Sequence, residues 1–131
     1  MKKDNLESSG SIGVLLHPSS LPDSPVCGTF GEPARQWLRL MATNGVEFWQ
    51  FLPLGPPDNF GSPYSSPSSF SFNPCFLDAD DLVNDGFIPQ NVLSELPGAK
   101  SINSGWVDFD LANKRSQKIG EFLRKFWHEQ S

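Results

Sequence analysis

The segment between positions 53 and 74 holds the side chains best suited to bind a small polar ligand. Tyr64 follows Ser62 and Pro63, and Asn73 stands near the end of the segment. An aromatic ring beside hydroxyl groups offers a ligand one apolar face and one hydrogen-bonding edge. We therefore predict ligand contacts by Tyr64, Ser62 and Asn73. The alternatives are ring packing for Tyr64, a plain turn for Ser62 and, favoured for Asn73, loop architecture.

His17 is a further candidate, because it directly follows the apolar run Ile12-Gly-Val-Leu-Leu16 and precedes Pro18. Binding and catalytic side chains of α/β proteins lie where a strand ends and its loop begins. A single histidine is more often a structural residue with satisfied hydrogen bonds, and we favour that reading. Ligand contact by His17 is the second possibility.

The remaining reactive side chains predict neither a metal site nor a cofactor site. Asp78, Asp80 and Asp81 lack the glycine and closing glutamate of a calcium loop, whereas acidic residues at a helix start are favoured by the helix dipole. Cys27 and Cys75 form no C-x-x-C pair, so a zinc site or a disulfide framework has no support. We expect two reduced thiols that act as small apolar fillers.

Two apolar runs, over residues 12–16 and 46–52, flank a helical pattern over 32–43. Both runs are continuous rather than alternating, which is typical of strands buried on both faces, and Trp49 and Phe51 are expected in the core. Two such strands joined by a helix predict a parallel pair and an α/β fold.

The ends of the helices have local signals. Thr29 and Glu32 have the spacing of a capping box, and Asn44-Gly45 closes the first helix. Short helices are predicted near 80–83 and over 89–96. A last helix begins near Asp110 and runs to the end of the chain. Its apolar stripe consists of Ile119, Phe122, Leu123 and Phe126, and we expect this stripe to need a partner outside the sequence.

The composition excludes several classes of partner. The 131 residues allow one domain, over 12–131, after a polar lead-in over 1–11 that we expect to be disordered. With 10 basic and 15 acidic residues the net charge is −5, which favours neither nucleic acid nor an anionic membrane. The amino terminus lacks the apolar core of a secretory signal, and no run approaches the ~20 apolar residues of a membrane span, so we expect a cytoplasmic protein.

Three motifs, in this order and spacing, resemble the opening of the 4-α-glucanotransferases (amylomaltases, or disproportionating enzymes) of glycoside hydrolase family 77. They are Gly13-Val-Leu-Leu-His-Pro-Ser-Ser-Leu21, Trp49-Gln-Phe-Leu-Pro-Leu-Gly-Pro56, and Ser62-Pro-Tyr64 followed by Ser71-Phe-Asn-Pro74. The segment Val107-Asp-Phe109 before the last helix also resembles that family. Many members carry a Tyr and an Asp just before Ser-Pro-Tyr, where this chain has Asp58-Asn-Phe-Gly61, so a secondary glucan contact by that Tyr is not expected here.

The resemblance implies an enzyme that cuts an α-1,4-glucan and transfers the released piece to the 4-hydroxyl of another glucan or of glucose. Donors of this kind are maltodextrins and fragments of starch or glycogen. The implied fold is a (β/α)8 TIM barrel, which typically needs ~250 residues. The chain would then supply the first βα units and part of an inserted helical subdomain. The loops 17–31 and 53–74 would lie at the sugar-binding face, and Tyr64 in the subsite on the donor side of the cleaved bond.

The resemblance also implies that the chemistry lies elsewhere. Retaining glycosyl transfer uses two carboxyl groups, one as nucleophile and one as acid and base. In the family these groups belong to later barrel strands, and no Asp or Glu in this chain matches their motifs. We therefore expect no catalytic residue in these 131 residues and no transferase activity of the chain alone.

Two alternatives remain open. The chain is a glucan-binding module without catalysis, with the aromatic loop 60–72 as its sugar platform, or it is a truncated part of the barrel that does not fold stably. A barrel cut in this way leaves sheet edges unpaired. A cooperative thermal transition would favour the module, and its absence the truncated part.

Overall fold

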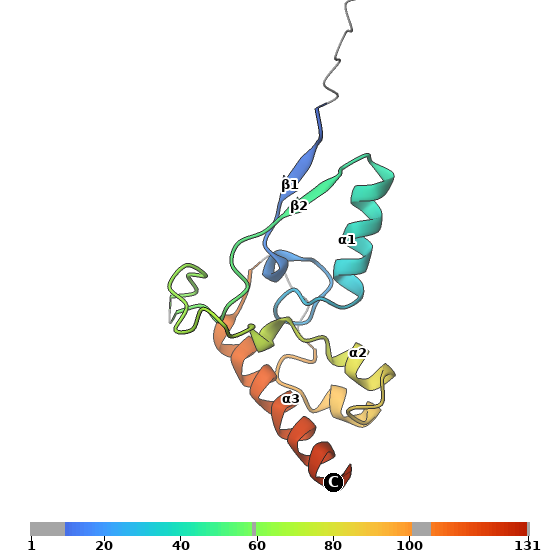
Figure 1. The fold of residues 1–131 in the computed structure, drawn as a ribbon. Coiled ribbons are helices and arrows are strands. Elements are labelled where there is room, and N and C mark those ends of the chain that lie inside the picture. Colours follow the sequence, from blue (N-terminus) through green and yellow to red (C-terminus); the bar gives the residue numbers. More distant parts are fainter. Residues whose placement is uncertain (1–9, 59, 101–105, 131) are drawn as a thin grey trace, which may run out of the picture.

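The computed structural model describes residues 10–58, 60–100 and 106–130. Two short strands, β1 (Gly13–Leu15) and β2 (Phe48–Gln50), pair in parallel, with Val14 opposite Trp49. The helix α1 (Glu32–Thr43) lies between them in the chain and beside them in space (Figure 1). The predicted parallel pair and the predicted helix over 32–43 are both confirmed, and the fold is a mixed α/β one.

The start of α1 differs from the prediction. Its N-cap is Gly31, which provides no side-chain cap, and the hydroxyl of Thr29 donates instead to Asp78 Oδ2. The predicted capping box is therefore wrong, because Thr29 forms a long-range bond rather than a local one. A Cβ at Gly31 would lie 2.1 Å from the Asp78 carboxyl carbon, so this carboxylate occupies the space of a side chain. The helix ends as predicted, with Asn44 as C-cap and Gly45 at φ 70°.

The strands are not buried on both faces, and that prediction is wrong for the described chain. Ile12, Leu15 and Phe48 are each 58–59% exposed, and Phe51 is also exposed. Trp49 is half-buried, and its indole N–H donates to the Leu16 carbonyl oxygen at 2.7 Å. The physical reason is that the sheet of the described residues has two strands, so much of its apolar surface has no second layer.

Helical segments make up the second half of the chain. The turn η2 (Pro74–Phe76) leads into α2 (Ala79–Asn84), and Asp78 caps α2 by accepting from the Asp81 N–H. This geometry confirms that the acidic group belongs to a helix start. The helix expected over 89–96 is a shorter 3-10 helix, η3 (Gln90–Ser94). The last helix, α3 (Phe109–Gln130), begins one residue before its predicted start.

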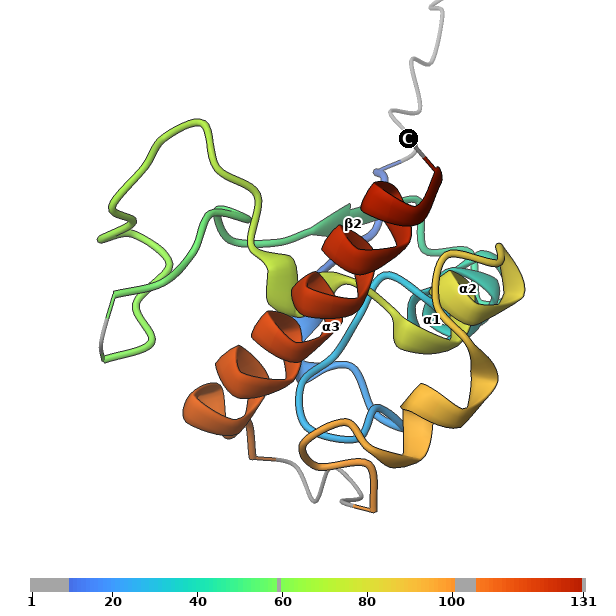
Figure 2. The ribbon, with the colours of Figure 1, turned by 90° about the horizontal axis from the view of Figure 1, so that it is seen from below.

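The core consists of two apolar clusters that share α3. The first contains Val26, Cys27, Cys75, Phe76 and Ala112, and the second contains Ala79, Ile88, Val92, Leu96 and Ile119. Figure 2 shows α3 running across the molecule beside the η2 turn and the α2–η3 segment. The two clusters make α3 the common support of both halves of the structure.

The apolar stripe of α3 finds partners within the chain, contrary to expectation. Ile119 is 2% exposed in the second cluster, and Phe122 and Leu123 pack against that cluster. Phe126 packs edge-on against Phe87, with ring centroids 5.9 Å apart. The segment 79–96, which the sequence did not connect with α3, supplies this covering layer.

Residues 1–9 of the expected lead-in lie outside the described residues. Among the described residues, 10–58, 60–100 and 106–130, none of the helices is long and apolar enough to cross a membrane.

Candidate functional site

The carboxyl ends of β1 and β2 lie at one edge of the sheet because the strands are parallel, and the loops that follow them enclose a cavity of ≈220 Å3. Its described lining combines hydroxyl, amide and imidazole groups with apolar surface. The lining residues are His17, Ser19, Ser20, Leu52, Gly55, Pro57, Gly61, Pro63, Asn73 and Phe109. Residues from all the sequence motifs described above thus meet around one space.

His17 has one satisfied and one unsatisfied ring nitrogen. Nδ1 lies 2.8 Å from Ser19 Oγ and accepts from the Ser19 N–H, which caps the short helix η1 (Pro18–Ser20). The ring also packs on Phe76 at 5.5 Å between centroids. Nε2 is buried without a hydrogen-bond partner among the described residues. Since Nδ1 accepts, the neutral ring carries its proton on Nε2.

The protonation state of His17 follows from its surroundings. Burial lowers the pKa of the ring from its ordinary value, and the nearby Pro53 carbonyl, which favours the charged form, opposes this shift. The ring is therefore neutral at neutral pH. A neutral imidazole can donate from Nε2 but adds no charge to the cavity.

Asn73 holds the base of the 53–74 loop. Its Oδ1 accepts from the Cys75 N–H at 3.0 Å, and its own N–H donates to the Leu54 carbonyl oxygen at 3.0 Å. The residue is 4% exposed. These bonds give Asn73 the architectural role that the sequence favoured. Its presence in the cavity lining leaves ligand contact as a prediction.

Asp58, which the sequence did not single out, shapes the turn that precedes Ser62. Its Oδ1 accepts from the N–H groups of Phe60 and Ser62, both at 2.9 Å, and its carbonyl oxygen accepts from the Gly61 N–H. An aspartate whose side chain bonds the backbone two residues ahead is the signal of an Asx turn. That signal was present in the sequence.

Tyr64 is not among the described lining residues of the cavity. It is 72% exposed and lies on a loop that extends away from the body of the molecule (Figures 1 and 2). Its neighbour Pro63 does line the cavity, and Ser62 is half-buried beside it. The structure thus brings His17 and Asn73 together and leaves Tyr64 outside the described lining of the cavity.

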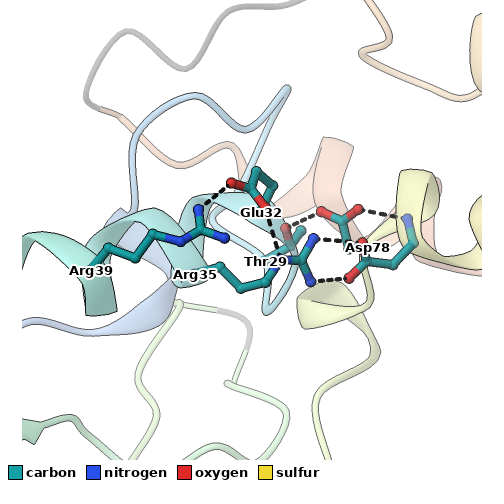
Figure 3. A network of polar contacts seen from close by, with 6 residues as sticks. Thr29, Glu32, Arg35, Arg39 and Asp78 are labelled. Carbon is teal, nitrogen blue, oxygen red and sulfur yellow. Dashed lines mark hydrogen bonds and ion pairs between the residues drawn. The ribbon is translucent and has the colours of Figure 1, made fainter.

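A charged network joins α1 to α2 at some distance from the sequence motifs (Figure 3). Arg35 binds both carboxylate oxygens of Asp81 at 2.8 Å and Glu32 at 2.8 Å, while Arg39 binds Glu32 at 2.7 Å. Hydrogen bonds from Arg35 and Arg39 lower the pKa of Glu32 to about 2, and the bond from Arg35 lowers the pKa of Asp81. Both carboxyl groups are ionised at neutral pH, so neither serves as a proton donor.

The other reactive groups belong to the core. Cys27 and Cys75 are both buried and unpaired, as expected for apolar fillers. Burial, with Cys75 nearby, raises the pKa of the Cys27 thiol to about 12, which suppresses the nucleophilic thiolate. Across residues 10–58, 60–100 and 106–130, no three His, Cys, Asp or Glu side chains converge as metal ligands.

A larger cavity of ≈660 Å3 lies between the α2–η3 segment and the carboxyl half of α3. Phe87, Phe122 and Phe126 contribute to its lining, together with Lys125 and Glu129. It contains none of the predicted site residues and lies away from the strand ends. We therefore base the functional argument on the smaller cavity, where the polar side chains of two loops converge.

Comparison with known proteins identifies the family. The family described as 4-alpha-glucanotransferase matches residues 16–131. The chain belongs to this family. A 4-alpha-glucanotransferase from Synechocystis sp. is 37% identical over 115 residues, which is 87% of this chain and 22% of the relative. One from Thermus thermophilus is 41% identical over 83 residues, 63% of this chain and 17% of the relative.

The fold comparison agrees. An amylomaltase from Streptococcus agalactiae, solved in complex with acarbose, is similar with a TM-score of 0.76 and 29% sequence identity. The match covers 91% of this chain and 24% of that one. This glucanotransferase-family chain therefore spans about a fifth of the length of the relatives it matches, and the resemblance found in the sequence motifs is confirmed.

Proposed function

We propose that this chain positions an α-1,4-glucan in a 4-α-glucanotransferase, which transfers a glucan segment to the 4-hydroxyl of another glucan or of glucose. The carrying observation is the cavity at the strand ends, where the loops after β1 and β2 meet. Family membership supports the substrate class. The parallel strands β1 and β2, joined through α1, fit the opening of a (β/α)8 barrel. The binding sites of such barrels lie at the carboxyl ends of the strands, where this cavity lies.

The lining suits a sugar. Its polar residues include His17, Ser19, Ser20 and Asn73, and its apolar part includes Phe109. Sugars need hydrogen-bonding edges and an apolar face, and such a site combines both. At ≈220 Å3 the space lies below the ~300 Å3 of the smallest drug-sized pockets, which favours one sugar unit rather than a chain. Tyr64, which is exposed and follows the lining residue Pro63, would then meet the neighbouring unit.

We further propose that the chemistry is not performed by these residues. A retaining pair needs carboxyl groups ~5 Å apart, with one of them protonated. The described lining of the cavity contains no Asp or Glu, and Glu32 and Asp81 are held ionised by Arg35. The chain alone is therefore expected to bind sugar without transferring it. A glucan-binding module without catalysis is the alternative reading of the same geometry.

Incubation of the chain with maltotriose tests the chemical part. The expected result is no glucose and no longer maltodextrin by chromatography. Appearance of both products would show that the chain carries a catalytic pair of its own.

Titration with acarbose, followed by NMR chemical shifts, tests the binding part. Loss of one hydrogen bond or ring contact costs ~0.5–1.5 kcal/mol. Tyr64→Ala should therefore weaken binding about two- to twelvefold. Trp127→Ala is the control, because Trp127 is 69% exposed, close to the 72% of Tyr64, but lies on the last turns of α3. An affinity unchanged by Tyr64→Ala, or equally reduced by both changes, would contradict the proposed site.

A further inference from the structure

The loop of residues 55–72 touches the body of the protein at a glycine. A Cβ at Gly61 would lie 2.8 Å from Phe109 Cε2 and 3.0 Å from Phe109 Cδ2. Real side chains do not approach a Cβ so closely, so the Phe109 ring lies directly on the Gly61 backbone. Gly61 also has φ 81°, which other residues adopt only with strain. Both the space and the backbone angle require glycine here.

The Gly61 side of this contact is ordered from within the loop. Asp58 bonds the backbone N–H groups of Gly61 and Ser62, as described above. Ser62 returns a bond, since its carbonyl oxygen accepts from the Asp58 N–H at 3.2 Å. The turn is therefore a small closed unit, and Phe109 contacts that unit from outside.

The Phe109 side is held by the helix. Phe109 is the first residue of α3, and the preceding Asp108 caps the helix by accepting from the Leu111 N–H at 2.9 Å. One turn later Ala112 is buried in the first core cluster, and Ser116 is buried a further turn along the helix. The ring thus projects from a rigid element and also lines the ≈220 Å3 cavity.

We propose that Phe109 is a positioning residue for the sugar site. Its ring clamps the Gly61 turn and so fixes Ser62, Pro63 and Tyr64 at the mouth of the cavity. This inference rests on the proposed function, because it assigns how the binding loop is held. Fixing a residue in one backbone conformation costs conformational entropy, and a turn that is already ordered before the sugar arrives binds it more tightly. Phe109 is not a member of either core cluster, whereas it does contact Gly61 and line the cavity.

The first measurement needs no ligand. Hydrogen exchange of the Gly61 and Ser62 amides reports the order of the turn. In Phe109→Ala we expect these amides to exchange at least tenfold faster. Phe109→Leu keeps bulk over Gly61 and should largely restore the wild-type rates. The control is Phe122→Ala, which removes a partly buried phenylalanine from the same helix at the second cluster and should leave the Gly61 and Ser62 amides unchanged.

The second measurement is acarbose affinity, read by NMR titration. Phe109→Ala should weaken binding about five- to tenfold, Phe109→Leu much less, and Phe122→Ala not at all. Far-UV circular dichroism and protection of the Ile119 amide verify that each variant is folded. Gly61→Ala gives an independent arm. Its clash disappears in the Phe109→Ala background, so its effect on affinity should be smaller there than in the wild type.

The outcomes separate the two proposals. Unchanged exchange at Gly61 and Ser62 in Phe109→Ala overturns the clamp, whether or not sugar binds. Additive effects of Gly61→Ala and Phe109→Ala on affinity overturn it as well. If the wild type binds no acarbose, the proposed function fails, and the exchange rates alone still show whether Phe109 orders the turn.

Discussion

Phe48 and Phe76 are the same residue type at opposite extremes of burial. Phe76 is 2% exposed and packs against Phe30 at 5.6 Å and Phe72 at 6.0 Å between ring centroids. Phe48, on β2, is 59% exposed. We predict that their replacement by alanine has very different effects on the free energy of unfolding.

The magnitudes follow from the buried fractions. Phe→Ala at a fully buried site costs ~3–5 kcal/mol, and this range applies to Phe76. About 40% of the Phe48 surface is buried, because the residue is 59% exposed. In proportion to this buried fraction, the expected loss for Phe48→Ala is ~1–2 kcal/mol. The two variants should therefore differ by about 2 kcal/mol or more.

Urea unfolding followed by far-UV circular dichroism measures both values, with the slope m checked for each variant. Circular dichroism is preferable to tryptophan fluorescence because Trp49 lies next to Phe48 in the chain. Equal losses for Phe48→Ala and Phe76→Ala would refute the reasoning, since they would mean that the outer face of the β1–β2 pair is buried in solution. The absence of any cooperative transition in the wild type would favour the truncated-barrel reading instead.

Three further predictions concern charge, backbone and thiol chemistry. Glu32→Gln removes a carboxyl group whose pKa falls from 4.5 to about 2 on folding. The stability advantage of the wild type over this variant should therefore be complete above pH 4.5 and vanish as the pH falls to 2. Urea midpoints of both proteins, measured at low salt across this pH range, test the prediction. Gly28→Ala places a Cβ 1.8 Å from the Pro18 carbonyl oxygen, and the forced shift of the turn after His17 should cost ~1–3 kcal/mol, seen as a lower melting temperature; an unchanged value would contradict the packing. Cys27 should resist iodoacetamide in the native protein and react in urea, read by mass spectrometry, and rapid native labelling would disprove its burial.

Local signals in the sequence were sufficient for the bounds of α1 but not for the segment 89–96, which forms the shorter 3-10 helix η3. The bounds of α1 follow from a proline in its first turn and from Asn44-Gly45 at its end. Each of these signals lies within a few residues of the helix end that it marks. The capping partner was wrong because Thr29 bonds Asp78, which lies 49 residues away and is invisible to local spacing. The prediction that the strands are buried on both faces was also wrong. A continuous apolar run indicates which surface a strand can bury, but it does not indicate whether another element covers that surface.

The candidate site was predictable where it depends on topology. Parallel strands place their carboxyl ends together, so His17 and the 53–74 loop were expected at one edge, and the cavity lies there. The exposure of Tyr64 and the contact between Gly61 and Phe109 depend instead on how the loop folds back onto α3. Such contacts between distant segments leave no periodic pattern in the sequence.

The first core cluster has a consequence for the order of events during synthesis. Its members come from both ends of the described chain, with Val26 and Cys27 early and Ala112 late. At ~5–20 residues per second, roughly 85 residues separate Val26 from Ala112 by about 4 to 17 s of translation. For that interval Val26 and Cys27 have been made without the helix that covers them in the first core cluster. These side chains therefore stay incompletely covered until α3 has been synthesised.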